Sequence, residues 1–165
     1  MTGRKALLSR PLVALVVIVF AVVLDQVVKI AVENYLPMEV REDFLPVLYL
    51  YLYRTYNLGV AFSLLSGMER EWIIGMRLLI VAFVIWLWRR TPNDRPFAHT
   101  GFTLIIAGAI GNLIDGVIYG HVVDYVLFQT ETWSFAVFNL ADSFITIGAG
   151  LVILDELFGP KKADQ

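Results

Sequence analysis

The sequence contains no cysteine, only two histidines and few charged residues for its length. Without cysteine, the chain can form no disulfide bond, thiolate nucleophile or cysteine-ligated metal site. Charged residues make up 17% of the chain, the net charge is -2, and no basic stretch is interleaved with aromatic residues. Because nucleic-acid binding requires such a basic surface, we expect no nucleic-acid partner.

Apolar residues are abundant instead: 58% of the chain is hydrophobic, and the mean hydropathy is +0.71. A membrane-spanning helix needs about 20 mostly apolar residues. The stretches that meet this requirement are residues 11–32, 72–88, 97–118 and 135–158. The sequence therefore predicts an all-α polytopic membrane protein, with residues 1–165 forming one integral membrane domain built on a four-helix transmembrane bundle.

Lysine and arginine cluster in three segments that flank the predicted spans. Eight of the thirteen basic residues lie there: Arg4, Lys5, Arg10, Arg89, Arg90, Arg95, Lys161 and Lys162. Short cytoplasmic segments of membrane proteins are enriched in these residues. We therefore expect both termini in the cytoplasm and the loops at residues 33–71 and 119–134 outside.

The longer outer loop, residues 33–71, contains the stretch VLYLYLYRTYNLGVAFS, in which leucine alternates with tyrosine. A period of two favours a β-strand, and Asn57 to Gly59 predicts a turn followed by a return strand over VAFS. We expect a small extracytoplasmic β-hairpin, or cradle, on the membrane surface. Its tyrosines suit the interface, and the same pattern also fits an aromatic anchor that contacts no ligand.

Polar residues interrupt the apolar spans at one depth, near their outer ends. Counting about 1.5 Å per helical residue places residues from three spans and two outer loops in this layer. They are Asp25, Lys29, Asn57, Asn112, Asp115, Asp124, Asn139, Asp142 and Ser143. Ionisable groups at membrane depth are costly and normally face a protein interior or a functional site. Their convergence at one level predicts a site.

Structural roles also fit several of these residues. Asp25 and Lys29 are spaced i, i+4 and can neutralise each other. The pattern N-L-x-D occurs twice, at Asn112 and at Asn139, and places an amide and a carboxylate on one helix face, where the asparagines favour interhelical hydrogen bonds. Gly116 and Gly120 have the GxxxG spacing that favours close helix packing.

Carboxylates gathered at one depth can support aspartic-protease chemistry. Two close carboxyl groups share a proton, so one acts as a general base on water while the other donates a proton. The candidates are Asp25, Asp115, Asp124 and Asp142. Spacing alone does not select the pair, although the N-L-x-D repeat favours Asp115 with Asp142.

Other catalytic and non-catalytic alternatives are weaker. The two histidines, His99 and His121, are predicted on opposite sides of the membrane, so no metalloprotease motif is present and we expect neither a metal nor a cofactor. Ser143 or Ser63 with Lys29 can form a Ser/Lys hydrolase only if Lys29 loses its proton, which Asp25 opposes. A proton-coupled transporter or a helical scaffold also accommodates buried carboxylates.

Five segments, in this order and spacing, resemble the lipoprotein signal peptidases, or signal peptidase II, of bacterial inner membranes. They are LDQVVK (24–29), YNLGVAFS (56–63), GNLID (111–115), GHVVDY (120–125) and FNLADS (138–143). The resemblance implies a catalytic dyad of Asp124 and Asp142 in place of the pair that the repeat favours. It implies supporting or substrate-binding roles for Asp25, Lys29, Asn57, Asn112, Asp115 and Asn139.

The resemblance also implies the substrate and the setting. The substrate is a prolipoprotein whose lipobox cysteine carries diacylglycerol, cleaved before that cysteine after entering from the membrane lipid. We expect a monomer that globomycin inhibits, with its site near the periplasmic face. Two positions depart from the family pattern: Gly116 stands where an arginine is usual, and Leu58 where a threonine is common. Arg54 and Arg77 are the candidates to replace that arginine.

The predicted topology can be tested with single cysteines, since the chain has none of its own. Cysteines introduced at Glu39 and Glu131 are expected to react with a membrane-impermeant maleimide in intact cells. Cysteines at Asn93 and Lys161 are expected to react only after the membrane is permeabilised. Protection of position 131 in intact cells would contradict the placement of the site at the outer face.

Overall fold

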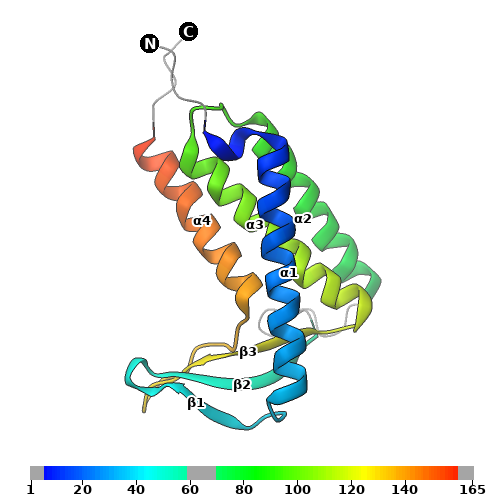
Figure 1. Ribbon diagram of the computed structural model, residues 1–165, viewed down its shortest axis with the longest axis vertical. Coiled ribbons are helices and arrows are strands. Elements are labelled where there is room, and N and C mark those ends of the chain that lie inside the picture. The colour runs from blue at the N-terminus through cyan, green and yellow to red at the C-terminus, as the bar shows by residue number, and fades with distance from the viewer. Residues whose placement is uncertain (1–5, 59–69, 160–165) are drawn as a thin grey trace.

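The computed structural model describes residues 6–58 and 70–159, which form long helices standing above a small sheet (Figure 1). The helices lie side by side, and the sheet lies across one end of them. In chain order the elements are η1 (Leu7–Ser9), α1 (Pro11–Tyr35), β1 (Arg41–Leu45), η2 (Pro46–Leu48), β2 (Leu50–Asn57), α2 (Arg70–Arg90), α3 (Pro96–Ile118), β3 (Val122–Phe128) and α4 (Leu140–Phe158).

Three of these helices are long and apolar enough to cross a membrane: α1, α2 from Glu71 onward, and α3. Their outward faces remain exposed and apolar, as at Leu12 and Phe20, which are 73% and 69% exposed. Such surface is stable only against lipid. The chain is therefore a multi-pass membrane protein. Helix α4 has 19 residues and carries three carboxylates, so composition alone does not identify it as a span.

Helix α3 is the central helix and packs against α1, α2 and α4. Small residues bring α3 and α4 close together. A Cβ atom at Gly101 would lie 2.5 Å from the carbonyl oxygen of Gly148, and one at Gly148 would lie 2.6 Å from that of Gly101. Between α2 and α3, the buried core is formed by Val84, Ala98, Phe102 and Ile106.

The predicted GxxxG packing at Gly116 and Gly120 is wrong. Gly120 lies after α3 with a φ of 79°, a left-handed conformation that favours glycine and turns the chain toward β3. A Cβ at Gly116 would meet only the guanidinium of Arg77 on α2. Gly120 therefore forms a turn after α3, and Gly116 leaves room for the Arg77 side chain.

The sheet is antiparallel, with the order β1-β2-β3. Strand β2 confirms the strand predicted from the alternating leucines and tyrosines. It pairs with β1 on one side and with β3 on the other, and Thr55 lies opposite Asp124. The predicted return strand at residues 60–63 lies outside the described residues. The sheet therefore joins the long outer loop to the segment that carries Asp124.

One local expectation needs correction, and it concerns the start of α4. Residues 122–128 form a strand, and the His121 ring before it lies against Tyr56 with 3.9 Å between ring centroids. Helix α4 begins at Leu140, later than the predicted start at Phe135. Phe138 instead bridges to Val126 of β3, which ties the beginning of α4 to the sheet.

At the end of the bundle opposite the sheet, an ion pair joins α3 to α4. The Nε and Nη2 of Arg95 donate to Oδ2 and to the backbone oxygen of Asp155, respectively. The Asp155 side chain is 1% exposed and that of Arg95 is 14% exposed. Nη2 also reaches Glu156 at 3.2 Å, but that side chain is 84% exposed. The hydrogen bond that Arg95 donates to Asp155 raises the pKa of Arg95 further.

The two acidic partners of Arg95 provide a matched test of this ion pair. Asp155→Ala is expected to lower the free energy of unfolding by about 3 kcal/mol, because it leaves a mostly buried guanidinium without its carboxylate. Glu156→Gln is expected to change it by less than about 0.5 kcal/mol, as exposed pairs contribute little. Denaturation of the purified protein in detergent measures both. Equal effects of the two substitutions would contradict the assignment.

Candidate active site

The site is built around the beginning of α4, where the first backbone N–H groups of a helix need partners outside the helix. Asn139 is the N-cap residue, and its side-chain oxygen accepts from the N–H of Asp142 at 2.9 Å. Asp142 Oδ2 accepts in return from the N–H of Asn139 at 3.2 Å. This reciprocal capping box fixes the position of the Asp142 carboxylate.

Two further N–H groups of this first turn are bonded to other elements. Leu140 N–H donates to the hydroxyl of Tyr125 on β3 at 3.1 Å. Ala141 N–H donates to Oδ1 of Asp25 on α1 at 3.0 Å. The start of α4 is thus held from the sheet and from α1 together. Its backbone cannot shift without breaking contacts to both.

Asn139 also joins the start of α4 to the sheet and to α3. Its Nδ2 donates to Oδ1 of Asp124 at 2.7 Å and to Oδ1 of Asn112 at 3.2 Å. The residue is 0% exposed, so all of its polar atoms need partners within the protein. One asparagine therefore contacts both Asp124 and Asp142 and holds their carboxyl groups in a fixed relation.

Asp124 lies on β3 and is 2% exposed. Its second oxygen, Oδ2, accepts from Asn57 Nδ2 on β2 at 3.1 Å. Burial raises the pKa of Asp124 to about 6, with the charge of Asp142 adding to the effect and the hydrogen bonds from Asn57 and Asn139 opposing it. Asp124 is therefore a carboxyl group that retains its proton at a higher pH than an exposed aspartate does.

Asp142 receives a second strong hydrogen bond from α3. Asn112 Nδ2 donates to Asp142 Oδ1 at 2.7 Å. Each carboxylate oxygen of Asp142 thus accepts one N–H, from Asn112 and from the backbone of Asn139. The predicted interhelical hydrogen bonding by the asparagines is confirmed, because Asn112 and Asn139 also bond to each other.

A buried cluster centred on Lys29 lies beside this pair of carboxyl groups. Lys29 Nζ is 2.8 Å from Asp25 Oδ2, 2.7 Å from Asp115 Oδ2 and 3.0 Å from Asn112 Oδ1. The predicted pairing of Asp25 with Lys29 is therefore confirmed, and Asp115 is a second partner. With these three acceptors Lys29 uses all the donors of an ammonium group, and its charge is held by two carboxylates.

Hydrogen bonds and ion pairs link all eight residues proposed from the sequence into one network spanning α1, α3, α4, β2 and β3. Sequence reasoning missed Gln26, whose Nε2 donates to Asp115 Oδ1 at 2.8 Å. It also missed Tyr125 as a partner of α4. The signal for Gln26 was its position in LDQVVK, between the two charged residues of span one.

The described contacts do not favour the Ser/Lys alternative. Ser143 Oγ donates to the backbone oxygen of Asn139 at 3.1 Å, whereas Lys29 Nζ contacts Asp25, Asp115 and Asn112. Ser63 lies outside the described residues. His99 lies near the start of α3 beside Trp88, whereas His121 follows the other end of that helix.

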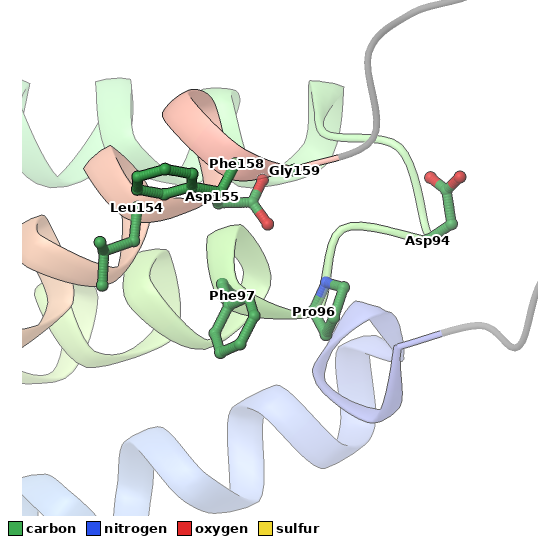
Figure 2. Close-up of a pocket in the computed structure, with 7 residues that line it drawn as sticks. All are labelled: Asp94, Pro96, Phe97, Leu154, Asp155, Phe158 and Gly159. Carbon is green, nitrogen blue, oxygen red and sulfur yellow. The ribbon is translucent and has the colours of Figure 1, made fainter.

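A hollow of about 500 Å³ lies at the other end of the bundle. Figure 2 shows Asp94 and Pro96 at the end that joins α2 to α3, and Phe97 and Leu154 facing the space between α3 and α4. Its lining contains none of the residues of the polar network. This hollow is therefore distinct from the candidate active site, which lies where the helices meet the sheet.

Taken together, the fold and the site define a helical membrane protein with a hydrogen-bonded carboxylate pair where its helices meet a small sheet. Residues 17–158 match the family model for signal peptidase II. The chain belongs to the signal peptidase II family. Since signal peptidase II is a protease, the chain is an enzyme.

Relatives and solved structures agree with this family. The chain is 60% identical over 162 residues to a lipoprotein signal peptidase of Sinorhizobium fredii, covering 98% of this chain and 96% of the relative. It is 52% identical to the lipoprotein signal peptidase of Mesorhizobium japonicum, over 86% of this chain and 83% of the relative. It is also 52% identical to that of Brucella ovis, over 88% of this chain and 90% of the relative. Its structure is similar to a bacterial membrane enzyme solved at 2.3 Å, with a TM-score of 0.81, 26% identity and coverage of 100% and 99%.

Proposed function

We propose that this chain is an aspartic endopeptidase that removes the signal peptide from diacylglyceryl-modified prolipoproteins, cleaving before the lipidated cysteine. Membership of the signal peptidase II family supports the reaction and the prolipoprotein substrate. One observation carries the aspartic mechanism: Asn139 is bonded to both Asp124 and Asp142. Two carboxyl groups from different elements are thereby held at one point, as an aspartic dyad requires.

The environments of the two carboxyl groups assign them different roles. The raised pKa of Asp124, about 6, favours a protonated acid that donates to the carbonyl oxygen of the scissile peptide bond. Asp142 accepts hydrogen bonds from Asn112 and from the backbone of Asn139, and an aspartic dyad pairs one proton donor with one proton acceptor. Asp142 is then the general base that accepts a proton from the attacking water.

The proposed reaction conserves protons and needs no cofactor. The water oxygen bonds to the carbonyl carbon while its proton passes to Asp142 and the Asp124 proton passes to the carbonyl oxygen. The resulting tetrahedral intermediate collapses as its carbon–nitrogen bond breaks. The proton on Asp142 moves to the leaving amine, and a hydroxyl of the intermediate returns a proton to Asp124. The dyad ends in its starting state.

The other residues of the network support the dyad. Asn57 and Asn139 orient Asp124, and Asn112 orients Asp142. Asp25 and Lys29 support the start of α4 through the bond from Ala141 N–H to Asp25. Asp115 is better suited to this structural cluster than to the dyad, because its oxygens accept from Gln26 and Lys29.

We propose that α4 is a fourth span. Its 19 residues extend about 28 Å at roughly 1.5 Å per residue, close to the thickness of a bilayer core of about 30 Å. Asp142 lies in its first turn, and Asp155 and Glu156 lie in its last turns, so the helix between them is uncharged. Glycine contacts also pack α4 closely along α3.

The proposed orientation in the bacterial inner membrane places the sheet and the dyad toward the periplasm and both termini in the cytoplasm. Arg89 and Arg90 end α2, and Arg95 precedes α3, at the end opposite the sheet (Figure 1). A signal-peptide helix with its lipid can reach the dyad laterally from the bilayer. One chain supplies every residue of the network, which supports a monomer as the functional unit.

The function can be tested with purified enzyme and a prolipoprotein in its lipidated and unlipidated forms. The enzyme is expected to cleave only the diacylglyceryl-modified form, at the bond before the modified cysteine, and globomycin is expected to block the cleavage. Mass spectrometry of the products locates the bond. Absence of cleavage by folded protein would contradict the proposal and favour a transporter or scaffold.

Substitution of each dyad residue tests the catalytic assignment. Asp124→Asn and Asp142→Asn are each expected to reduce turnover by at least about 10²- to 10⁴-fold, because an amide cannot exchange the proton. Asp115→Asn, a change of the same size in the neighbouring cluster, is expected to reduce turnover less. Thermal unfolding controls for folding. A folded Asp124→Asn enzyme with near-normal turnover would remove Asp124 from the dyad and return Asp115 as its replacement.

A further inference from the structure

Arg77 is a charged residue of α2 that the proposed mechanism has not used. It lies about 10 Å along the helix from Arg70, at roughly 1.5 Å per residue, and is half-buried. Its Nη1 donates to the backbone oxygen of Asn112 at 3.0 Å. Within residues 6–58 and 70–159, it forms no ion pair with a carboxylate. A cation at this depth normally marks a functional site.

The guanidinium of Arg77 occupies space that only glycine leaves open on α3. Gly116 is buried, and a Cβ atom there would lie 2.7 Å from Arg77 Nη1. The next nearest atom would be Arg77 Cζ at 4.0 Å, with no other side chain or backbone group of the described chain within that distance. The absence of a side chain at position 116 therefore leaves room for the guanidinium of Arg77.

The charge of Arg77 acts on three carboxyl groups of the site. They are Asp142, Asp115 and Asp124. Asn112 links Arg77 to the pair, because its backbone oxygen accepts from Arg77 and its Nδ2 donates to Asp142 Oδ1 at 2.7 Å. Lys29 is the other cation of the network and also acts on Asp124, but Asp25 and Asp115 contact it directly. Within the described residues, Arg77 is the cation of the site that no carboxylate contacts.

Arg54, the other arginine considered from the sequence, has a structural role. Its Nη1 donates to the backbone oxygens of Glu33 and Leu36 at 2.7 and 3.0 Å, at the end of α1. These carbonyls have no partner within the helix. Arg54 therefore caps α1 at the sheet, and of the two arginines it is Arg77 that lies beside the dyad.

We propose that Arg77 is a positioning residue of the peptidase: its guanidinium, seated against Gly116, keeps the Asp124–Asp142 pair singly ionised at the working pH. This inference rests on the proposed function. An opposite charge favours the ionised form of a carboxyl group, so the arginine opposes the uptake of a second proton by the pair. The charged groups around the pair are Asp25 and Lys29 on α1, Arg77 on α2, Asp115 on α3, and Asp124 and Asp142 themselves.

The pH profile of cleavage separates this electrostatic role from a structural one. A singly ionised dyad gives a bell-shaped profile whose limits belong to the pair. In Arg77→Gln, loss of the positive charge is expected to move both limits to higher pH by about 0.5 to 1 unit, less than the roughly 1 to 3 units of a charge in direct contact. Arg77→Lys retains the charge and is expected to keep the original profile.

A second substitution tests whether charge alone restores the profile. In Arg77→Gln/Gly116→Arg, the positive charge comes from α3 instead of α2, and the optimum is expected to return toward that of the unsubstituted enzyme. A lost packing contact at Arg77 would not be restored in this way. Gly75→Ala, on α2 with nothing within 4 Å of the added methyl group, is the control and is expected to leave the profile unchanged.

The measurement is kcat/KM for lipidated precursor between pH 4 and 9 (roughly the range that protein carboxyl groups and histidine titrate). An optimum in Arg77→Gln that coincides with that of the unsubstituted enzyme overturns the inference. If Arg77→Gln is too unstable to assay, the double variant decides: cleavage with the original optimum supports the inference, and no cleavage counts against it. Failure of the unsubstituted enzyme to cleave would instead overturn the proposed function.

Discussion

The structure of the site depends on one buried asparagine at the beginning of a helix. Asn139 caps α4 and also bonds to Asp124 on the sheet and to Asn112 on α3. A fully buried amide without partners would destabilise the fold by several kcal/mol (about 2–7 on transfer scales), so these contacts form together or not at all. The requirement to satisfy one side chain thus brings together three elements that are distant in the sequence.

The rest of the fold holds this point in place from both ends of α4. At the site, Asp25 and Tyr125 bind the first turn of the helix. At the other end, Arg95 binds Asp155, and between them Gly101 and Gly148 allow α3 and α4 to approach closely. A site assembled from packed helices and a paired strand is rigid, which suits the proposed dyad of Asp124 and Asp142.

Sequence reasoning succeeded where a constraint acts locally or through the membrane. The cost of polar groups in lipid predicted that polar residues at one depth would meet, and the i, i+4 spacing predicted the contact of Lys29 with Asp25. It failed where the partner comes from a distant element. The repeat favoured Asp115 for the dyad, but Lys29 and Gln26 hold Asp115 in another cluster, and no pattern along one helix reveals that competition.

The sequence by itself determined the membrane setting, the layer of polar residues and, through motifs spread along the chain, the resemblance to signal peptidase II. These follow from composition, spacing and order, which the chain carries without folding. Only the tertiary structure decided which polar groups contact each other, that residues 122–128 pair as a strand, and that Arg77 lies against Gly116. Hydrogen bonds and charges act over a few ångströms, so their partners depend on how distant segments pack.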